Sequence, residues 1–212
     1  MVRWVGRLRF AEAAQVGRRF GLDERHTYRR LRGLVRAGLV DHRRVFHNQP
    51  GVYWATRDGL DAAGVRLPPA GIDIRTYEHD RLAAVAAIAL EDEFGPSAIV
   101  TERELRSLDA AAETPRYAVP RGGQAQLGRR GLHFPDLAVD GQDGRPLAVE
   151  VELTAKGRGR LDSIVAGYVR ARHIAAVRYY AAPAARAGLE RAIARARAGH
   201  LFAIHNTEEL HP

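Results

Sequence analysis

Cysteine is absent from this chain of 212 residues. Its absence excludes disulfides, thiolate zinc sites and cysteine nucleophiles. Any metal ion would therefore need oxygen or imidazole ligands. The composition also fits a reducing compartment such as the cytoplasm.

Long apolar runs are missing as well. The longest, residues 83–90, is too short to cross a bilayer. The first residues lead into an arginine-rich stretch, whereas a signal peptide would continue into an apolar core. We therefore expect a cytoplasmic protein with no membrane partner.

Lysine is almost absent, because Lys156 is the one lysine among 33 basic residues. Arginine stays charged in proteins, whereas the compact lysine ammonium can shift its pKa, so chemistry can require one and not the other. Lys156 is therefore a candidate for a chemical role. Chance survival in an arginine-biased chain is the alternative.

The net charge of +8 is concentrated in one part of the chain. Residues 1–50 hold 12 arginines against four acidic residues, while the rest of the chain holds 21 basic and 21 acidic residues. A solvated basic face would not account for this segregation. The pattern is typical of a phosphate-binding module attached to a neutral one.

The basic region predicts a winged helix-turn-helix, whose second helix enters the major groove of DNA. Asp23 offers an N-cap for the second helix, Gly38 ends it, and Thr56 caps the last. A small helical bundle with a hairpin is the alternative. The expected elements are helices over 8–20 and 25–37, strands over 39–46 and 51–55, and a helix ending at 63.

The second helix is predicted to have an apolar face and a cationic face. The inward residues would be Tyr28, Leu31, Leu34 and Val35. Basic residues spaced four, three and four apart form a separate stripe. We expect this helix to contact duplex DNA through Arg25, Thr27, Arg29, Arg30, Arg32 and Arg36.

A second domain is expected after a proline- and glycine-containing linker. The boundaries would be 1–66 for the winged helix, 67–76 for the linker and 77–212 for an α/β domain with a mixed sheet, an α+β chain overall. Its expected elements are helices over 77–94, 160–173 and 183–198, an irregular segment over 108–130, and strands over 98–102, 132–139, 146–153, 176–181 and 201–205.

Two glutamates alternate with apolar residues in the strand predicted around 149–153. Glu150 and Glu152 would share one face, roughly 7 Å apart, and would repel each other unless a cation offsets their charges. Asp136 precedes this strand across a turn, so it can approach Glu150. The sequence therefore predicts a carboxylate cluster.

Carboxylate oxygens suit hard cations such as Mg²⁺ or Mn²⁺, and a bound ion can activate water and offset charge on a phosphate. Asp136 and Glu150 are the candidate ligands, with Glu152 positioning water and Lys156 stabilising a phosphate. The alternative is an exposed polar face in which the glutamates pair with arginines around 158–160.

Four further residues are candidates for the same chemistry. His79, beside Asp80, and His133 could add metal or proton-transfer chemistry. Glu102 and Glu104 would alternate on the earlier strand, and one of them could reach the site. For all of these, an ordinary surface or core role is the alternative.

Pro135-Asp136 followed by Glu150-x-Glu152, in an α-β-β-β-α-β frame, resembles the PD-(D/E)xK nuclease superfamily. The usual lysine position is Glu152 here, and Lys156 lies four residues further on. Some members of that superfamily use glutamate there, and others have a displaced lysine. The resemblance implies a metal-dependent DNA endonuclease with Asp136, Glu150, Glu152 and Lys156 in the site.

The whole chain resembles the replication-relaxation family. The matching stretches are residues 28–34, 37–40, 52–60, 101–106, and 133–136 with 149–154. The resemblance implies DNA binding in plasmid replication or mobilisation, with a relaxase or replication protein as a further partner. A non-catalytic accessory protein and a winged-helix transcription regulator remain alternatives, and the sequence specifies no oligomeric state.

Overall fold

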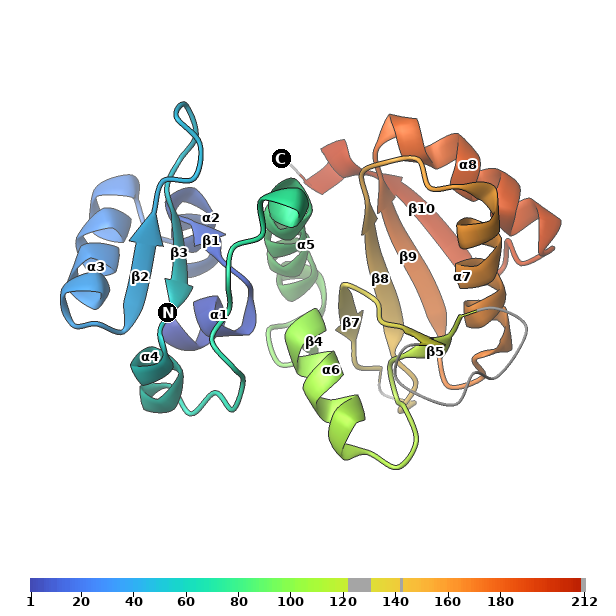
Figure 1. Ribbon diagram of the computed structural model, residues 1–212, viewed down its shortest axis with the longest axis horizontal. Coiled ribbons are helices and arrows are strands. Elements are labelled where there is room, and N and C mark those ends of the chain that lie inside the picture. The colour runs from blue at the N-terminus through green and yellow to red at the C-terminus, as the bar shows by residue number, and fades with distance from the viewer. Residues whose placement is uncertain (122–130, 142, 211–212) are drawn as a thin grey trace. The chain divides into compact units, whose positions relative to one another are not determined.

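The computed structural model describes residues 1–121, 131–141 and 143–210. It divides the chain into two compact units, Met1–Ile88 and Ala89–Pro212 (Figure 1). Both units combine helices with strands, so the expected α+β class is confirmed. Across these described ranges, no helix is both long and apolar enough to cross a membrane.

The division falls within helix α5 (Tyr77–Phe94), later than the linker expected at 67–76. Tyr77 is buried and its ring stacks on Phe10 with centroids 5.0 Å apart. Leu67, inside the expected linker, is also buried in the core of the first unit. Packing of this segment against the first unit therefore moves the boundary.

The first unit contains a three-stranded antiparallel sheet in the order β1-β3-β2. Helices precede and follow its strands (Figure 1). The elements are α1 (Val2–Arg7), β1 (Ala11–Glu12), α2 (Ala13–Phe20), α3 (Glu24–Arg36), β2 (Val40–Arg43), β3 (Val52–Ala55), α4 (Arg57–Ala62) and the short 3₁₀ helix η1 (Ile74–Thr76).

The prediction of a single helix over 8–20 is wrong for the first half of that range. The chain there forms β1, and α2 begins only after Glu12. A reciprocal capping box explains the late start, because the Glu12 backbone N–H donates to Gln15 Oε1 at 2.8 Å while the Glu12 side chain caps the helix in return. Leu8 and Ala11 are nevertheless buried.

The predicted limits of α3 and α4 are confirmed. The Asp23 side chain accepts a hydrogen bond from the His26 backbone at 2.8 Å, and Gly38 takes a left-handed conformation with φ of 70°. The Thr56 hydroxyl caps α4 by accepting from the Gly59 backbone at 3.0 Å. Local capping therefore sets the limits of both helices, and α3 leads through Gly38 into β2.

The second unit is built on a mixed sheet in the order β10-β9-β8-β7-β4, which confirms the expected mixed sheet. Strands β8, β9 and β10 are parallel, whereas β7 is antiparallel to both of its neighbours. The elements after α5 are β4 (Ile99–Thr101), α6 (Glu102–Ala111), β5 (Val119–Pro120), β6 (Leu132–His133), β7 (Leu137–Val139), β8 (Leu147–Glu152), α7 (Arg158–Arg170), β9 (Ala176–Ala181), α8 (Pro183–Arg195), β10 (Phe202–Asn206) and the 3₁₀ helix η3 (Thr207–Leu210).

Helices α7 and α8 provide the crossovers that parallel strands need, and they cover one face of the sheet (Figure 1). Ala148 of β8 packs in the same buried cluster as Val165 and Tyr168 of α7. Because side chains alternate along a strand, Glu150 and Glu152 must face the same way as Ala148. The fold therefore directs both glutamates under α7.

The strand predicted over 98–102 is shorter, and Glu102 and Glu104 lie in α6. Thr101 and Glu104 form a capping box in which the Thr101 backbone N–H donates to Glu104 Oε2 at 2.9 Å. The expected alternation of the two glutamates on a strand is therefore wrong. The segment predicted as irregular, 108–130, contains the end of α6 and the short strand β5, and its residues 122–130 lie outside the described residues.

Candidate functional site

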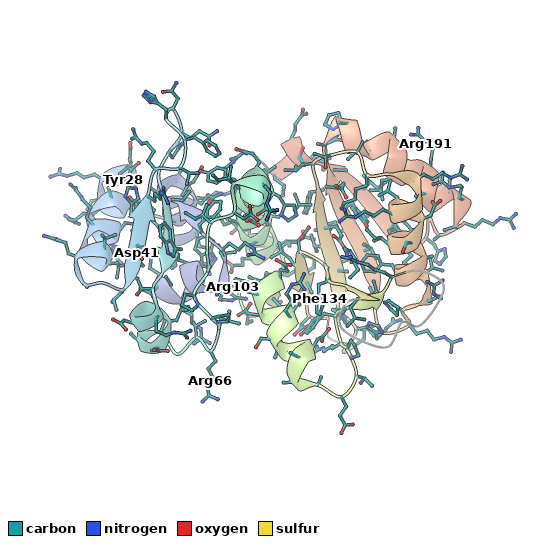
Figure 2. The ribbon with its side chains drawn as sticks, viewed as in Figure 1. Tyr28, Asp41, Arg66, Arg103, Phe134 and Arg191 are labelled. Atoms are coloured by element: carbon teal, nitrogen blue, oxygen red, sulfur yellow. The ribbon has the colours of Figure 1, made fainter. Side chains whose placement is uncertain are left out.

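Exposed arginines occur in both units, as Arg66 and Arg191 illustrate (Figure 2). Charge alone therefore does not identify a binding site. Helix α3 differs because its arginines form a regular face. The arginines of this face are all exposed. They are Arg25, Arg29, Arg32 and Arg36.

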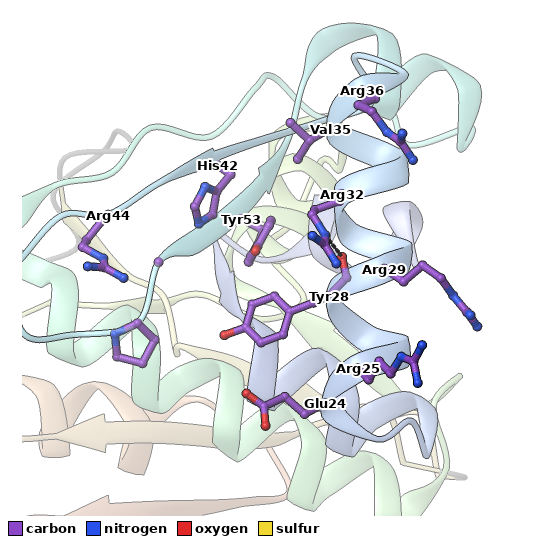
Figure 3. Close-up of a pocket in the computed structure, with 12 residues that line it drawn as sticks. Glu24, Arg25, Tyr28, Arg29, Arg32, Val35, Arg36, His42, Arg44 and Tyr53 are labelled. Atoms are coloured by element: carbon purple, nitrogen blue, oxygen red, sulfur yellow. Dashed lines mark hydrogen bonds between the residues drawn. The ribbon is translucent and has the colours of Figure 1, made fainter.

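A groove of about 970 Å³ runs between α3 and the β2–β3 hairpin (Figure 3). One wall carries the arginine face of α3, and the other carries His42, Arg44 and Tyr53. Glu24 is the acid among the lining residues, so the groove is strongly cationic. In Figure 3, Arg25 and Arg29 point away from the hairpin, which places their guanidinium groups on the outer rim.

Tyr28 and Val35 were predicted to face the core, and this prediction is wrong. Their exposed fractions are 38% and 36%, and both line the groove. Leu31 is fully buried. At 100° per residue, Tyr28 and Val35 lie 20° apart, between Leu31 and the arginine face. The buried arc of α3 is therefore narrower than expected, and the groove has an apolar floor.

Thr27 and Arg30 do not belong to this groove. Thr27 is 1% exposed, and its hydroxyl donates to the Asp23 carbonyl at 2.8 Å. It faces α2, where Gly17 leaves room for it. Arg30 is exposed, but its charge acts on the N-terminus and not on the groove. The pKa of the Met1 amino group is lowered mainly by burial, and also by the charges of Arg19 and Arg30. The structure thus removes Thr27 from the exposed face and separates Arg30 from the groove.

Glu150 lies at the centre of the predicted carboxylate cluster and is 4% exposed. Its Oε1 lies 2.5 Å from His133 Nε2 and accepts a hydrogen bond from the Tyr168 hydroxyl. Burial alone would raise the pKa of Glu150, but His133, Tyr168 and Lys156 together hold that pKa below its ordinary value. Glu150 is therefore a buried carboxylate that stays ionised.

Tyr168 remains a hydrogen-bond donor for a related reason. Its hydroxyl is buried, and burial together with the charge of Glu150 raises the pKa of Tyr168 well above its ordinary value. Tyr168 is not among the site residues predicted from the sequence. A tyrosine within the apolar stripe of a helix needs a polar partner for its hydroxyl, but the partner depends on where α7 crosses β8.

Glu152 and Lys156 form an ion pair at the end of β8. Burial raises the pKa of Glu152. The positive charge of Lys156 lowers this pKa, whereas the negative charges of Glu150 and Asp136 raise it further. The alternative of an exposed glutamate face is wrong because both glutamates are buried. Lys156 stays partly accessible, with 22% of its side chain exposed.

Asp136 lies opposite Glu150, as expected from the hairpin. Leu137 pairs with Val149, so the preceding residue falls across from Glu150 on the same face. Asp136 Oδ2 accepts a hydrogen bond from the Val151 backbone N–H at 2.7 Å. The four predicted residues, Asp136, Glu150, Glu152 and Lys156, are thus brought together by β7, β8 and the start of the β8–α7 connection.

The cluster has the oxygen chemistry that a hard cation prefers. Each of its acids also has a protein partner: His133 and Tyr168 for Glu150, Lys156 for Glu152, and the Val151 N–H for Asp136. Within residues 1–121, 131–141 and 143–210, no group of three or more His, Asp or Glu side chains is arranged to hold a metal ion.

The remaining predicted candidates have local roles. His79 lies 3.6 Å from Asp80 in the part of α5 that belongs to the first unit. Glu102 pairs with Arg106 at 2.7 Å, and Glu104 caps α6.

Comparison of the whole chain with protein-family models, curated proteins and solved structures found no match to any of them.

Proposed function

We propose that this chain is a DNA-binding protein of plasmid or mobile-element replication or mobilisation, and that its first unit is a winged helix-turn-helix. The observation that carries the proposal is the arginine face of α3 beside a cationic groove. The order of three helices, hairpin and helix supports the same assignment. A relaxase or replication protein is the further partner implied by the family resemblance.

The major groove of duplex DNA, about 12 Å wide, admits an α-helix. Arg25 and Arg29 point outward from the same side of α3, where they would contact phosphates along one edge of the major groove (Figure 3). Phosphate contacts release counterions, so their contribution to affinity falls as salt rises. Binding through α3 should therefore depend steeply on salt concentration.

The test is the affinity of the purified full chain for a duplex, measured by fluorescence anisotropy over a range of salt concentrations. In Arg25→Ala plus Arg29→Ala, the slope of log affinity against log salt should fall by about two. Arg66→Ala plus Arg191→Ala removes the same charge from exposed positions outside the groove and should leave the slope unchanged. Equal slopes in all three proteins would refute binding through α3.

A second candidate function is metal-dependent hydrolysis of DNA by the second unit. It is favoured by the convergence of Asp136, Glu150 and Glu152 on one face of the sheet, with Lys156 paired to Glu152. Asp136 and Glu150 would hold Mg²⁺ or Mn²⁺, and the bound ion would supply an activated water and offset charge on the phosphate. Lys156, which is partly exposed, would contact the scissile phosphate, and Glu152 would orient Lys156 and water.

The alternative is a nuclease-like unit that does not cut and serves as an accessory in replication, mobilisation or transcription. This alternative is supported by the contacts of the cluster, because each acid already has a hydrogen-bond or ion-pair partner within the protein. Supercoiled plasmid incubated with Mg²⁺ or Mn²⁺ distinguishes the two. Nicking that is lost in Glu150→Gln, a variant of equal size that is shown by thermal unfolding to be folded at the assay temperature, would establish the endonuclease. A band shift with intact plasmid would leave a DNA-binding accessory protein.

A further inference from the structure

The groove beside α3 has a feature that phosphate binding does not require. Tyr28 and Val35 are large apolar residues that remain more than a third exposed on its floor. Phosphate contacts need cations and hydrogen-bond donors, which the arginines already provide. An exposed aromatic ring on this face therefore points to an additional partner surface that is apolar.

The two side chains are regularly placed. They are seven positions apart in the sequence, which gives roughly 10.5 Å along the helix axis and a rotation of about 20°. This distance corresponds to about three base-pair steps of DNA at 3.4 Å each. Arg32 lies between Tyr28 and Val35 on the same side of α3, and its Nε donates to the Tyr28 carbonyl at 3.4 Å (Figure 3).

The major-groove edge of DNA offers apolar surface at the C5-methyl group of thymine. We propose that Tyr28 and Val35 determine the DNA sequence that this protein prefers, by contacting thymine methyl groups about three base steps apart. Arg32, between them, contacts a guanine edge, which presents two acceptors to one guanidinium group. This inference rests on the proposed binding of duplex DNA through α3.

The position of the other groove residues supports duplex DNA as the occupant. Arg25 and Arg29 lie on the outer rim, where they suit phosphates, and Arg44 lies on the opposite wall. Cations on both sides of an apolar floor complement a double helix, whose phosphates flank its base edges. On α3, the residues that position the duplex through its phosphates are thus different from the residues that distinguish its bases.

The experiment begins with selection of preferred duplexes from a randomised library by the full chain. Each thymine of the selected site is then replaced by uracil, which removes only the methyl group. One such replacement should weaken binding of the unmodified protein about three- to five-fold, as expected for one buried methyl group. The same replacement should have no effect on Tyr28→Ala. A second uracil replacement, about three base steps from the first, should also weaken binding of the unmodified protein but should have no effect on Val35→Ala.

Two variants control for indirect effects. Tyr28→Leu keeps an apolar side chain and should retain sensitivity to uracil. Arg29→Ala should weaken binding to all duplexes alike and also retain that sensitivity. Thermal unfolding of each variant checks that it is folded.

The outcomes separate the inference from the function on which it rests. If uracil weakens binding equally in the unmodified protein and both alanine variants, or if the selected site holds no thymine, the inference is overturned while DNA binding stands. If the unmodified protein binds no duplex, the proposed function fails and the inference fails with it. A partner other than DNA would then occupy the groove.

Discussion

At the scale of single residues, Glu150 is notable because its carboxylate is buried within the second unit. A carboxylate that is almost fully buried is costly unless hydrogen bonds and a positive charge offset the loss of hydration. His133 and Tyr168 supply hydrogen bonds from two different elements, β6 and α7. Glu150 therefore connects the sheet to the helix that covers it.

Tyr168→Phe should destabilise the protein by about 1–3 kcal/mol, because it removes a donor from a buried carboxylate and leaves the packing nearly unchanged. The free energy of unfolding in urea measures the effect. Tyr179→Phe is the matched control, since Tyr179 is a buried tyrosine on β9 that forms none of the described hydrogen bonds to Glu150. An equal loss in both variants would contradict a specific role for the Tyr168 hydroxyl.

Glu150→Gln should have a cost in stability that depends on pH. The folded-state pKa of Glu150 lies below its ordinary value of 4.5, so its ionised form stabilises the fold above that pH. This contribution is lost as pH falls below 4.5 and through the lowered folded pKa. Unfolding at pH 7 and at steps below pH 4.5 should show the difference between the two proteins shrinking. A difference that does not change with pH would mean that the pKa of Glu150 is the same in the folded and the unfolded protein, which would contradict the lowered pKa.

At the scale of elements, helix α4 packs close to the β2–β3 hairpin. A Cβ on Gly59 would lie 1.9 Å from the Leu39 carbonyl oxygen, whereas a Cβ on Gly33 of α3 would meet nothing within 4 Å. The two glycines therefore have opposite roles. Gly59 permits contact between elements, and Gly33 only weakens its own helix.

Gly59→Ala should destabilise the protein by about 1–3 kcal/mol through overpacking, while Gly33→Ala should stabilise it by about 0.5–1 kcal/mol through helix propensity. Thermal or urea unfolding of the two variants measures both effects under the same conditions. Similar results for the two substitutions would show that the contact with Leu39 does not constrain α4.

Elements with a strong local signal could be predicted from the sequence, and those governed by tertiary contacts could not. The caps at Asp23 and Thr56 fixed the limits of α3 and α4. The capping box at Thr101 and Glu104 is also present in the sequence, but the alternating charges of the same stretch favour a strand. The site could be predicted as far as Asp136, Glu150, Glu152 and Lys156, because strand alternation and a turn bring them together. The roles of His133 and Tyr168 depend on β6 and α7, whose positions no local pattern specifies.

At the scale of the whole molecule, the charge is divided between units of different character. The excess of basic residues lies in 1–50, which falls entirely in the first unit. The buried acids of the carboxylate cluster, Glu150 and Glu152, lie in the second unit. This division predicts that electrostatic attraction to DNA acts mainly through the first unit.

Hydrogen exchange of the full chain with and without a short duplex tests this division. DNA should slow amide exchange in α3 and in the β2–β3 hairpin, because binding stabilises the bound region against local opening. A duplex without the preferred sequence, at low salt, should protect the same segments less. Protection confined to β8 and α7 would place the DNA on the second unit instead.

The pairing of Lys156 with Glu152 offers a direct view of the carboxylate cluster. Because Lys156 carries the sole ε-amine of the chain, reductive methylation with ¹³C-formaldehyde would label one side chain in addition to the N-terminus. The labelled amine would sit beside a buried acid. Its NMR signal would therefore report arrival of a cation or a nucleic acid at that cluster, without a substitution anywhere in the protein.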